Sequence, residues 1–249
     1  MSATPGWNSV PLGAAVALNA ADIHVWRVPL ERTEAQIRRT REILSPDEIL
    51  RADRFYFQRD RDSFVAARGT LRQLLGEYLK RSPEEIDFAY GAYGKPSLRQ
   101  GSATPSVHFN VSHSHGLALM AFSLGRELGI DVESIRPNIA SEEIAERYFS
   151  PNEVAELRSL PPELRAEGFF LCWTRKEAYI KALGNGLQIP LKSFHVGLTP
   201  NEPAYLKSVD SERWMLRSLR PAIGFVGAIL AEGQDWELRC WDRTPENSA

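Results

Sequence analysis

The amino-acid sequence predicts an α+β fold, in which helices and strands are mixed along the chain. Three observations support this class. An early segment alternates apolar and polar residues, two Ser-Pro-x-Glu motifs have the composition of helix starts, and the C-terminal third alternates short apolar runs with turns. Of the 249 residues, 43% are hydrophobic and 25% charged, which is the composition of a globular protein that buries a sizeable core.

The first half of the chain begins with a segment, residues 1–20, that mixes Pro, Gly, Ala and Asn and is expected to lie loosely on the surface. The alternation in Ala21–Val28 then predicts a half-buried strand. Ser45-Pro46-Asp47-Glu48 predicts a helix start, with serine as N-cap, proline in the first turn and glutamate three residues after the cap. Helical sequence continues, with interruptions, through Phe64–Leu79.

The middle of the chain contains three predicted strands and two predicted helices. Phe109–Ser114 has strand character, Leu117–Phe122 predicts a more buried strand, and Leu128–Glu133 predicts a third. Ser150-Pro151-Asn152-Glu153 repeats the helix-start pattern, and a long helix is expected over about 163–183.

The C-terminal third predicts antiparallel strands in Ile223–Leu230 and Trp236–Trp241, and residues after Thr244 are expected to be frayed. The two halves also resemble each other weakly. Ile23-His24-Val25 is echoed by Ile130-Asp131-Val132, and the helix start at Ser45 by the one at Ser150. One interpretation is coincidence, since such helix starts are common. The other is two similar subdomains joined near residues 125–129, with a ligand cleft between them.

Charge, cysteine content and hydropathy exclude several classes. The net charge is −2 and the pI about 6.2, whereas general nucleic-acid binders carry a positive excess. Cys172 and Cys240 are too few for a disulfide framework, and Cys172 is expected to be an inert core thiol. We see no signal peptide and no apolar stretch approaching the roughly 20 residues of a membrane-spanning helix. The expectation is a soluble protein of a reducing cytoplasm.

Two carboxylates on one predicted strand are the first candidate functional groups. Asp131 and Glu133 are two residues apart, so both project from the same face. One interpretation is a solvent-facing strand edge with ordinary charges. The other is a Mg²⁺ site, because this cation prefers carboxylate oxygens together with phosphates and water.

Glu177 and Lys181 form an i,i+4 pair on the flank of the long predicted helix. The pair has the spacing of an ordinary surface ion pair. A carboxylate and an ammonium beside a buried face also suit metal and phosphate, because lysine offers a point charge and glutamate ligates metal or accepts a proton.

Three other positions carry candidate functional groups. His113 lies between Ser112 and Ser114, where it is either structural or an anion contact. Gly94-Lys95-Pro96 is a turn that carries a lysine but lacks the glycines of a P-loop. Arg51 lies with Arg54 on a helix face that is otherwise expected to be solvated. The sequence contains no G-x-S-x-G, H-E-x-x-H or G-x-G-x-x-G motif.

Taken in chain order, these motifs resemble those of the larger, Sfp-like 4′-phosphopantetheinyl transferases over roughly residues 22–240. The resemblance rests on Ser45–Tyr56 and on four motifs that follow it: Gly94-Lys95-Pro96, Phe109-Asn110-Val111-Ser112-His113-Ser114, Gly129-Ile130-Asp131-Val132-Glu133 and Trp173-Thr174-Arg175-Lys176-Glu177-Ala178.

The resemblance implies a monomeric pseudo-dimer of two similar α+β subdomains with the active site in the cleft between them. On this basis we expect a loose segment at residues 1–20, an N-terminal subdomain at 21–127 and a C-terminal subdomain with the metal site at 128–244. The implied enzyme is of the holo-[acyl-carrier-protein] synthase type. It moves the 4′-phosphopantetheine group of coenzyme A to a serine of an apo acyl or peptidyl carrier protein, with Mg²⁺, and releases adenosine 3′,5′-bisphosphate. It has neither a nucleic-acid nor a membrane partner.

The resemblance also implies roles for individual residues. It makes Asp131, Glu133 and Glu177 the Mg²⁺ ligands, with Glu133 the ligand whose contact is either direct or indirect. Glu177 would also deprotonate the carrier serine, and Lys181 would contact the diphosphate. The remaining residues implied in coenzyme A binding are Arg51, Tyr90, Gly94, Lys95, Pro96, Asn110, Ser112 and His113.

Two positions depart from the family pattern. Glu48 replaces a basic phosphate contact and Phe64 replaces a threonine, which weakens 3′-phosphate binding unless Arg54 or Arg68 compensates. Two other functions stay open: a binding module without turnover, and a different Mg²⁺-dependent phosphoryl or nucleotidyl transferase. The surface expected to receive the carrier is either the helices around Arg68, Arg72 and Tyr78 or the segment 136–149.

Overall fold

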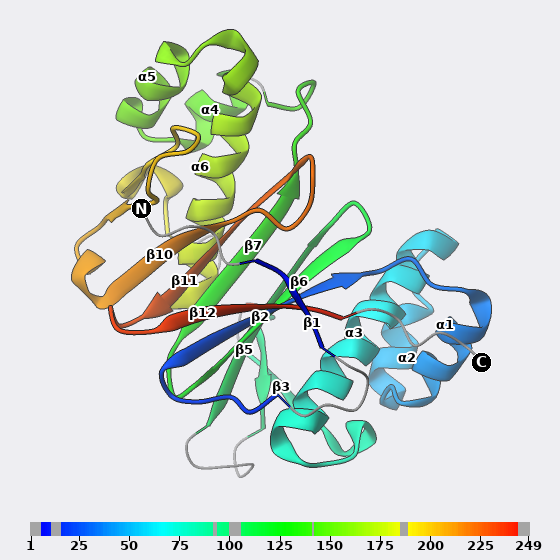
Figure 1. Ribbon diagram of the computed structural model, residues 1–249. Coiled ribbons are helices and arrows are strands. Elements are labelled where there is room, and N and C mark those ends of the chain that lie inside the picture. Colours follow the sequence, from blue (N-terminus) through cyan, green and yellow to red (C-terminus); the bar gives the residue numbers. More distant parts are fainter. Residues whose placement is uncertain are drawn as a thin grey trace.

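The computed structural model describes residues 6–10, 16–91, 94–99, 106–140, 142–184 and 189–243. Its helices and sheets confirm the α+β class (Figure 1). The helices are α1 (Glu34–Glu42), α2 (Pro46–Ala52), α3 (Gln58–Leu79), α4 (Glu142–Tyr148), α5 (Pro151–Ser159) and α6 (Pro162–Leu183). The strands are β1 (Asn8–Ser9), β2 (Asp22–Pro29), β3 (Phe88–Tyr90), β4 (Pro96–Leu98), β5 (Val107–Ser114), β6 (Leu117–Leu124), β7 (Leu128–Ser134), β8 (His195–Val196), β9 (Leu206–Lys207), β10 (Trp214–Leu219), β11 (Phe225–Glu232) and β12 (Glu237–Asp242).

A five-stranded sheet, in the order β1-β12-β2-β6-β5, forms the N-terminal half together with α1, α2 and α3 (Figure 1). The strand predicted over residues 21–28 is confirmed as β2, but the expectation that it is half-buried is wrong, because β2 is buried on both faces. Trp26 and Val28 pack into a core with α3, while Ile23 and Val25 pack into a second core that also contains β7 and β11 residues. The sequence alternation reflects polar side chains, such as His24, that are themselves buried.

A three-stranded sheet, in the order β10-β11-β7, is covered by α6 in the C-terminal half. β7 pairs antiparallel with β11, with Asp131 opposite Ala228. Phe169 and Phe170 of α6 pack against Ala228 and Leu230 of β11 in a common core. The long helix predicted over 163–183 is therefore confirmed, and it lies directly against the strand that carries the candidate carboxylates.

The two halves repeat the same arrangement of strands and helices. β2, β6 and β5 form consecutive antiparallel pairs, and β7, β11 and β10 do the same. A capped short helix and a 22-residue helix follow β2 as α2 and α3, and follow β7 as α5 and α6. The weak echo between the halves therefore reflects a structural repeat, as expected for a pseudo-dimer.

The last strand differs from its prediction. Residues 236–241 were expected to pair antiparallel, but β12 pairs parallel with β2 on one side and with β1 on the other. This strand of the C-terminal segment therefore belongs to the sheet of the N-terminal half. The division of the chain at residue 127 remains a prediction.

Part of the segment expected to be loose is held in place. β1 pairs with β12, and the Trp7 indole Nε1 donates to the carbonyl oxygen of Arg220 at 3.1 Å. The Arg27 guanidinium lies 4.9 Å from the Trp7 ring centroid. Residues 1–5 and 11–15, and the segment after Thr244 that was expected to be frayed, lie outside the described residues.

In each half, a buried pair of an acidic and a basic side chain joins two helices. In the N-terminal half, Glu48 of α2 accepts a hydrogen bond of 2.6 Å from Arg72 Nε of α3. The Arg72 Nη1 group also donates to the carbonyl oxygens of Pro83 and Ile86, at 2.8 and 2.9 Å. The pair therefore ties the capped helix to the long helix and to the turn that follows it.

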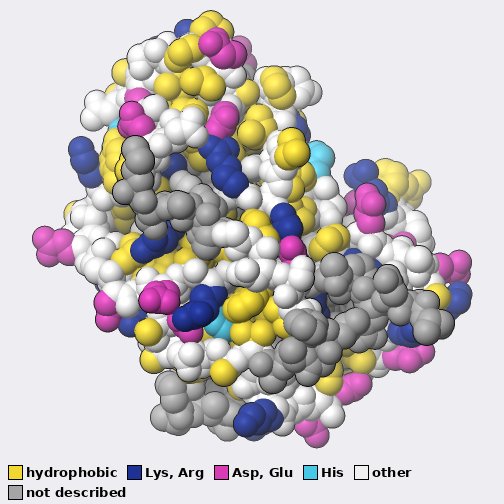
Figure 2. Space-filling view, in the orientation of Figure 1, with side chains coloured by type: hydrophobic (Ala, Val, Ile, Leu, Met, Phe, Trp, Pro, Cys, Tyr) yellow, Lys and Arg dark blue, Asp and Glu magenta, His cyan; other side chains and the backbone are white. Residues whose placement is uncertain are grey.

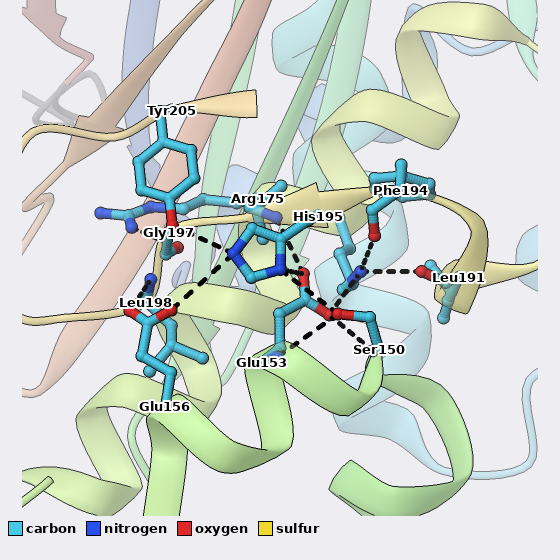
Figure 3. A network of polar contacts seen from close by, with 12 residues as sticks. Ser150, Glu153, Glu156, Arg175, Leu191, Phe194, His195, Gly197, Leu198 and Tyr205 are labelled. Atoms are coloured by element: carbon cyan, nitrogen blue, oxygen red, sulfur yellow. Dashed lines mark hydrogen bonds and ion pairs between the residues drawn. The ribbon is translucent and has the colours of Figure 1, made fainter. Parts of the chain in front are cut away.

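The C-terminal half repeats this device with different residues. Glu153 of α5 lies 2.8 Å from Lys176 Nζ of α6, and Lys176 donates to the carbonyl oxygens of Leu191 and Phe194. Figure 3 shows Glu153 in this network, facing His195 as well. Glu153 and Lys176 are almost fully buried, so this pair belongs to the core of its half.

Charged side chains of both signs are interspersed over the face of the molecule in Figure 2.

The two cysteines, Cys172 and Cys240, are free and buried, and burial raises the pKa of each thiol. Within the described ranges, no helix is long and apolar enough to span a membrane.

Candidate active site

A ladder of side-chain hydrogen bonds joins the two halves next to the predicted site. β5 belongs to the five-stranded sheet and β7 to the three-stranded sheet. Three alternate residues of β5 each place a side-chain oxygen where it accepts from a backbone N–H of β7. The pairs are Asn110 Oδ1 with Ile130 (2.9 Å), Ser112 Oγ with Val132 (3.4 Å) and Ser114 Oγ with Ser134 (3.3 Å).

Asp131 lies inside this junction and is 4% exposed. Its Oδ1 accepts from the Ser112 hydroxyl at 2.7 Å and from Lys181 Nζ at 2.6 Å. Its Oδ2 is buried and has no hydrogen-bond partner among the described residues. One oxygen of this carboxylate is therefore fixed, while the other is left without the partner that a buried anion requires.

Glu133 is held in a similar way two residues further along β7. Its Oε2 accepts from the Ser114 hydroxyl at 2.8 Å and from Arg136 Nη2 at 3.0 Å. Burial raises the pKa of the Glu133 carboxyl, against the opposing effect of the Ser114 hydrogen bond, and the charge of Asp131 raises it further.

Glu177 faces the two β7 carboxylates from α6. It makes no hydrogen bond or ion pair with the part of the chain that the structure describes. Burial and then the charges of Asp131 and Glu133 raise the pKa of its carboxyl, while the Lys181 charge lowers it. The structure therefore brings the three predicted acids into one electrostatic cluster, with Lys181 as a cation beside them.

Gly129 permits this juxtaposition of strand and helix. A Cβ atom at this position would lie 2.1 Å from the carbonyl oxygen of Ala178 and 2.4 Å from the nitrogen of Ala182. Any other residue would push α6 away from β7. The glycine two residues before Asp131 therefore sets how closely Glu177 and Lys181 approach it.

The donor set fits a hard divalent cation. Carboxylate oxygens are the ligands that Mg²⁺ prefers, and the unpartnered Asp131 Oδ2 is where a cation would satisfy a buried acceptor. In residues 6–10, 16–91, 94–99, 106–140, 142–184 and 189–243, no three His, Cys, Asp or Glu side chains already have the geometry of a metal cage. Oε2 of Glu133 is occupied by Ser114 and Arg136.

Two of the residues predicted to bind coenzyme A line the same cavity, of about 610 Å³. Arg51 and Tyr90 line it together with Arg54. The Arg51 guanidinium lies 5.3 Å from the centroid of the Phe64 ring, in cation–π contact. Phe64, which replaces a threonine of some relatives, is therefore a flat support for a cation.

Arg68 lies behind this cavity and is 9% exposed. Its guanidinium lies 5.9 Å from the Phe64 ring centroid and 6.0 Å from that of Tyr90, and its buried Nη1 has no partner among the described residues. Burial lowers the pKa of Arg68. Glu48 Oε1 lies 3.6 Å from Arg68 Nε. Glu48 is 2% exposed, so it is a structural residue rather than a phosphate contact.

The Gly94-Lys95-Pro96 motif lies apart from Arg51. Gly94 has a φ of 77°, which allows the turn between β3 and β4. Lys95 Nζ lies 3.6 Å from Glu127 Oε2 and 3.4 Å from the carbonyl oxygen of Leu128. Lys95 and Pro96 line a cavity of about 670 Å³ that neither Arg51 nor Tyr90 lines. Pro96 is nevertheless the cross-strand partner of Tyr90, so this motif adjoins a residue that lines the Arg51 cavity.

His113 follows Ser112 on β5 but is exposed. The surrounding protein, and then the Lys181 ammonium, lower the pKa of its imidazole, while Asp131 raises it. His113 therefore lies within electrostatic reach of the carboxylate cluster. Asn110, predicted as a ligand contact, already uses its side-chain oxygen for the ladder.

Sequence reasoning missed two residues of this site, Ser114 and Arg136, which hold Glu133. The alternation of Asn110, Ser112 and Ser114 on one strand face was the available signal. One proposed carrier surface is also wrong: Arg68 and Arg72 are buried, and the Tyr78 hydroxyl accepts from the Trp26 indole, so these side chains form no basic rim.

The chain matches known proteins over most of its length. Residues 127–224 match the 4′-phosphopantetheinyl transferase superfamily model, and residues 28–124 match a 4′-phosphopantetheinyl transferase N-terminal model. The chain is 42% identical to the 4′-phosphopantetheinyl transferase HetI of Nostoc sp. over 226 residues, which are 91% of this chain and 94% of the relative.

Two further proteins are similar to this chain over smaller parts of it. The 4′-phosphopantetheinyl transferase Sfp of Bacillus subtilis is 31% identical over 74% of this chain and 78% of its own length. The structure of holo-[acyl-carrier-protein] synthase from Thermotoga maritima covers 43% of this chain and 62% of its own, at 24% identity and a TM-score of 0.34. From the identity and coverage of the curated relatives, the chain belongs to the 4′-phosphopantetheinyl transferase family.

Proposed function

We propose that this transferase moves the 4′-phosphopantetheine group of coenzyme A onto a serine of an apo acyl or peptidyl carrier protein, in a Mg²⁺-dependent reaction. The observation that carries the proposal is the buried Asp131, whose Oδ2 has no described partner and whose neighbours are Glu133, Glu177 and Lys181. Bound at these carboxylates, Mg²⁺ would neutralise negative charge on a diphosphate during the transfer.

Lys181 supplies a fixed positive charge for the same diphosphate. Its ammonium contacts Asp131 Oδ1 and the carbonyl oxygen of Ile130, which keeps it at the margin of the cluster. Charge that develops on the bridging and leaving oxygens is stabilised by such preorganised groups. Arg51 and Arg54, with the unpartnered Arg68 Nη1 behind them, provide the cationic cavity for the 3′-phosphate end.

Glu177 is the proposed general base. A serine hydroxyl is a weak nucleophile at neutral pH, so its proton must pass to a base as it attacks. Glu177 makes no described hydrogen bond, and its environment favours the protonated form, so it accepts a proton readily. The serine oxygen forms a bond to phosphorus, the bond from phosphorus to the leaving phosphate oxygen breaks, and adenosine 3′,5′-bisphosphate departs.

The active form is proposed to be a cytoplasmic monomer of the holo-[acyl-carrier-protein] synthase type. One chain contributes both the carboxylates of β7 and α6 and the arginines of α2 and α3. The site therefore needs no second copy to be complete. The segment 136–149 remains the candidate carrier surface.

Mass spectrometry tests the proposal directly. Incubation with coenzyme A, Mg²⁺ and an apo carrier protein is expected to add the mass of one phosphopantetheine group to the carrier. Asp131→Ala and Glu177→Gln are expected to lose at least about 100-fold in rate while keeping the wild-type circular dichroism spectrum. No mass gain with the apo carriers of the same genome would contradict the proposal. ATP in place of coenzyme A tests the competing nucleotidyl transferase.

A further inference from the structure

Two serine hydroxyls of β5 each donate a hydrogen bond to one of the two β7 carboxylates. Ser112 donates to Oδ1 of Asp131 at 2.7 Å, and Ser114 donates to Oε2 of Glu133 at 2.8 Å. In each carboxylate the second oxygen makes no hydrogen bond with the described residues. One oxygen of each acid is thus fixed by the opposite half of the molecule, and one is left open.

The direction of these bonds is set by the ladder. A hydroxyl has one proton to donate, and each serine oxygen already accepts from a β7 backbone N–H: Ser112 from Val132 and Ser114 from Ser134. His115 Nδ1 also lies 3.1 Å from Ser114 Oγ. An ionised carboxylate only accepts, so each serine proton is directed at a carboxylate. Turning either serine side chain away would also break its contact with the backbone N–H of β7.

Arg136 makes the role of Ser114 sharper. Its Nη2 binds the same Oε2 of Glu133 at 3.0 Å, and its guanidinium lies 5.4 Å from the Phe170 ring centroid. Without the Ser114 hydroxyl, the Arg136 guanidinium alone would determine where the Glu133 carboxylate points. Ser114 counters Arg136 by pulling Glu133 toward β5, the side on which Asp131 is held by Ser112.

We infer that Ser114 is a positioning residue that holds Glu133 in register with Asp131, so that the open oxygens of the two acids face one divalent cation. The inference rests on the proposed Mg²⁺ site. It also gives the side-chain ladder a function: the N-terminal half orients acids that are carried by the C-terminal half. Partners that orient metal ligands typically contribute 10- to 100-fold to metal affinity.

Direct binding of Mn²⁺, a paramagnetic substitute for Mg²⁺, tests this without an activity assay. Titration followed by electron paramagnetic resonance, with and without coenzyme A, is expected to show about tenfold weaker Mn²⁺ binding in Ser114→Ala than in wild type. Ser114→Thr keeps the hydroxyl and is expected to restore most of the affinity. The carrier assay is expected to show the same loss as a raised Mg²⁺ requirement, with the rate at saturating Mg²⁺ changed less.

Ser123→Ala is the matched control. Ser123 is a fully buried serine of β6 whose hydroxyl donates to the carbonyl oxygen of Arg126 at 2.6 Å, away from the carboxylates. Unchanged or tighter Mn²⁺ binding in Ser114→Ala, or an equal loss in Ser123→Ala, would overturn the inference and leave the metal site standing. Absence of Mn²⁺ binding in the wild type, with and without coenzyme A, would overturn the metal site and this inference together.

Discussion

Asp131 and His24 occupy equivalent places in the two halves, on β7 and β2, but their side chains lie in different environments. Asp131 faces a cluster of acids and a lysine at the junction. His24 is fully buried, and its Nδ1 lies 2.9 Å from the Tyr78 hydroxyl, which also accepts from the Trp26 indole. Only one copy of the repeat therefore carries the acids, while the other carries a neutral imidazole.

The buried His24 is expected to make stability depend on pH. Burial is the main cause that lowers its pKa from 6.5 to about 4, so below pH 6.5 the unfolded chain binds a proton that the folded chain refuses. Stability is therefore present above pH 6.5 and lost as the pH falls toward 4, by about 3 kcal/mol for this group. Urea unfolding between pH 4 and 7 measures the slope.

His24→Gln is the comparison for this experiment. The amide oxygen can accept from the Tyr78 hydroxyl, but the side chain does not titrate. The variant is expected to lose less stability than the wild type between pH 6.5 and 4. Parallel pH profiles for the two proteins would show that His24 is not the group responsible.

At the scale of elements, the close approach of β7 and α6 depends on Gly129. Gly129→Ala is expected to lower the free energy of unfolding by about 1–3 kcal/mol, because the added methyl group meets backbone atoms that cannot move independently. It is also expected to reduce phosphopantetheine transfer, since Glu177 moves away from Asp131. Urea unfolding and the carrier assay measure the two effects. Gly6→Ala, which meets nothing within 4 Å, is the control, and equal behaviour of the two variants would contradict the prediction.

The buried pair of Glu153 and Lys176 gives a second prediction about elements. Glu153→Gln leaves the Lys176 ammonium buried without its counter-ion, which is expected to cost about 3–5 kcal/mol of stability. Thermal unfolding followed by circular dichroism measures this as a lower melting temperature. Glu34→Gln removes the exposed pair with Arg38 and is expected to change stability by only about 0.5 kcal/mol. A melting temperature like that of Glu34→Gln would disprove a structural role for the buried pair.

Elements with local signals were predictable from sequence. Both Ser-Pro-x-Glu motifs form capping boxes, and the helix expected over about 163–183 spans Pro162–Leu183. The burial of β2 on both faces was not predictable, because one face packs with α3 and the other with β7 and β11 of the other half. Its pairing with β12 was not predictable either, because β12 lies far from it in the sequence.

The candidate site was predictable in part. Asp131, Glu133, Glu177 and Lys181 carry spacing signals and do gather, whereas Ser114 gains its role only when β5 and β7 meet. Arg136 contacts Glu133 from three residues further along the chain, a local pair that the sequence analysis overlooked. Glu48 was interpreted through the nucleotide site, but its partner Arg72 lies one helix away and buries it. Contacts between distant segments therefore account for what the sequence did not reveal.

At the scale of the whole molecule, the two halves share a core. Ile23, Val25 and Leu119 of the five-stranded sheet pack in one cluster with Ile130 and Ile229 of the three-stranded sheet. Neither half therefore buries its apolar surface alone, although each repeats the same arrangement.

A fragment experiment tests this shared core. Residues 21–127 and 128–243, produced separately, are each expected to lack a cooperative urea transition, because the first fragment lacks β12 and both expose the shared cluster. Near-ultraviolet circular dichroism of the mixed fragments is expected to recover native signal. Cooperative unfolding of 21–127 by itself would show that the N-terminal half is an independent domain.

The position of β12 between β1 and β2 has a consequence for biosynthesis. The ribosome makes β2 before β5 and β6, yet β12, one of its two neighbours, is the last of the described strands to emerge. Until then the nascent chain presents an unpaired strand edge, a surface that invites chaperones or aggregation. The first sheet to be synthesised is thus among the last to be completed.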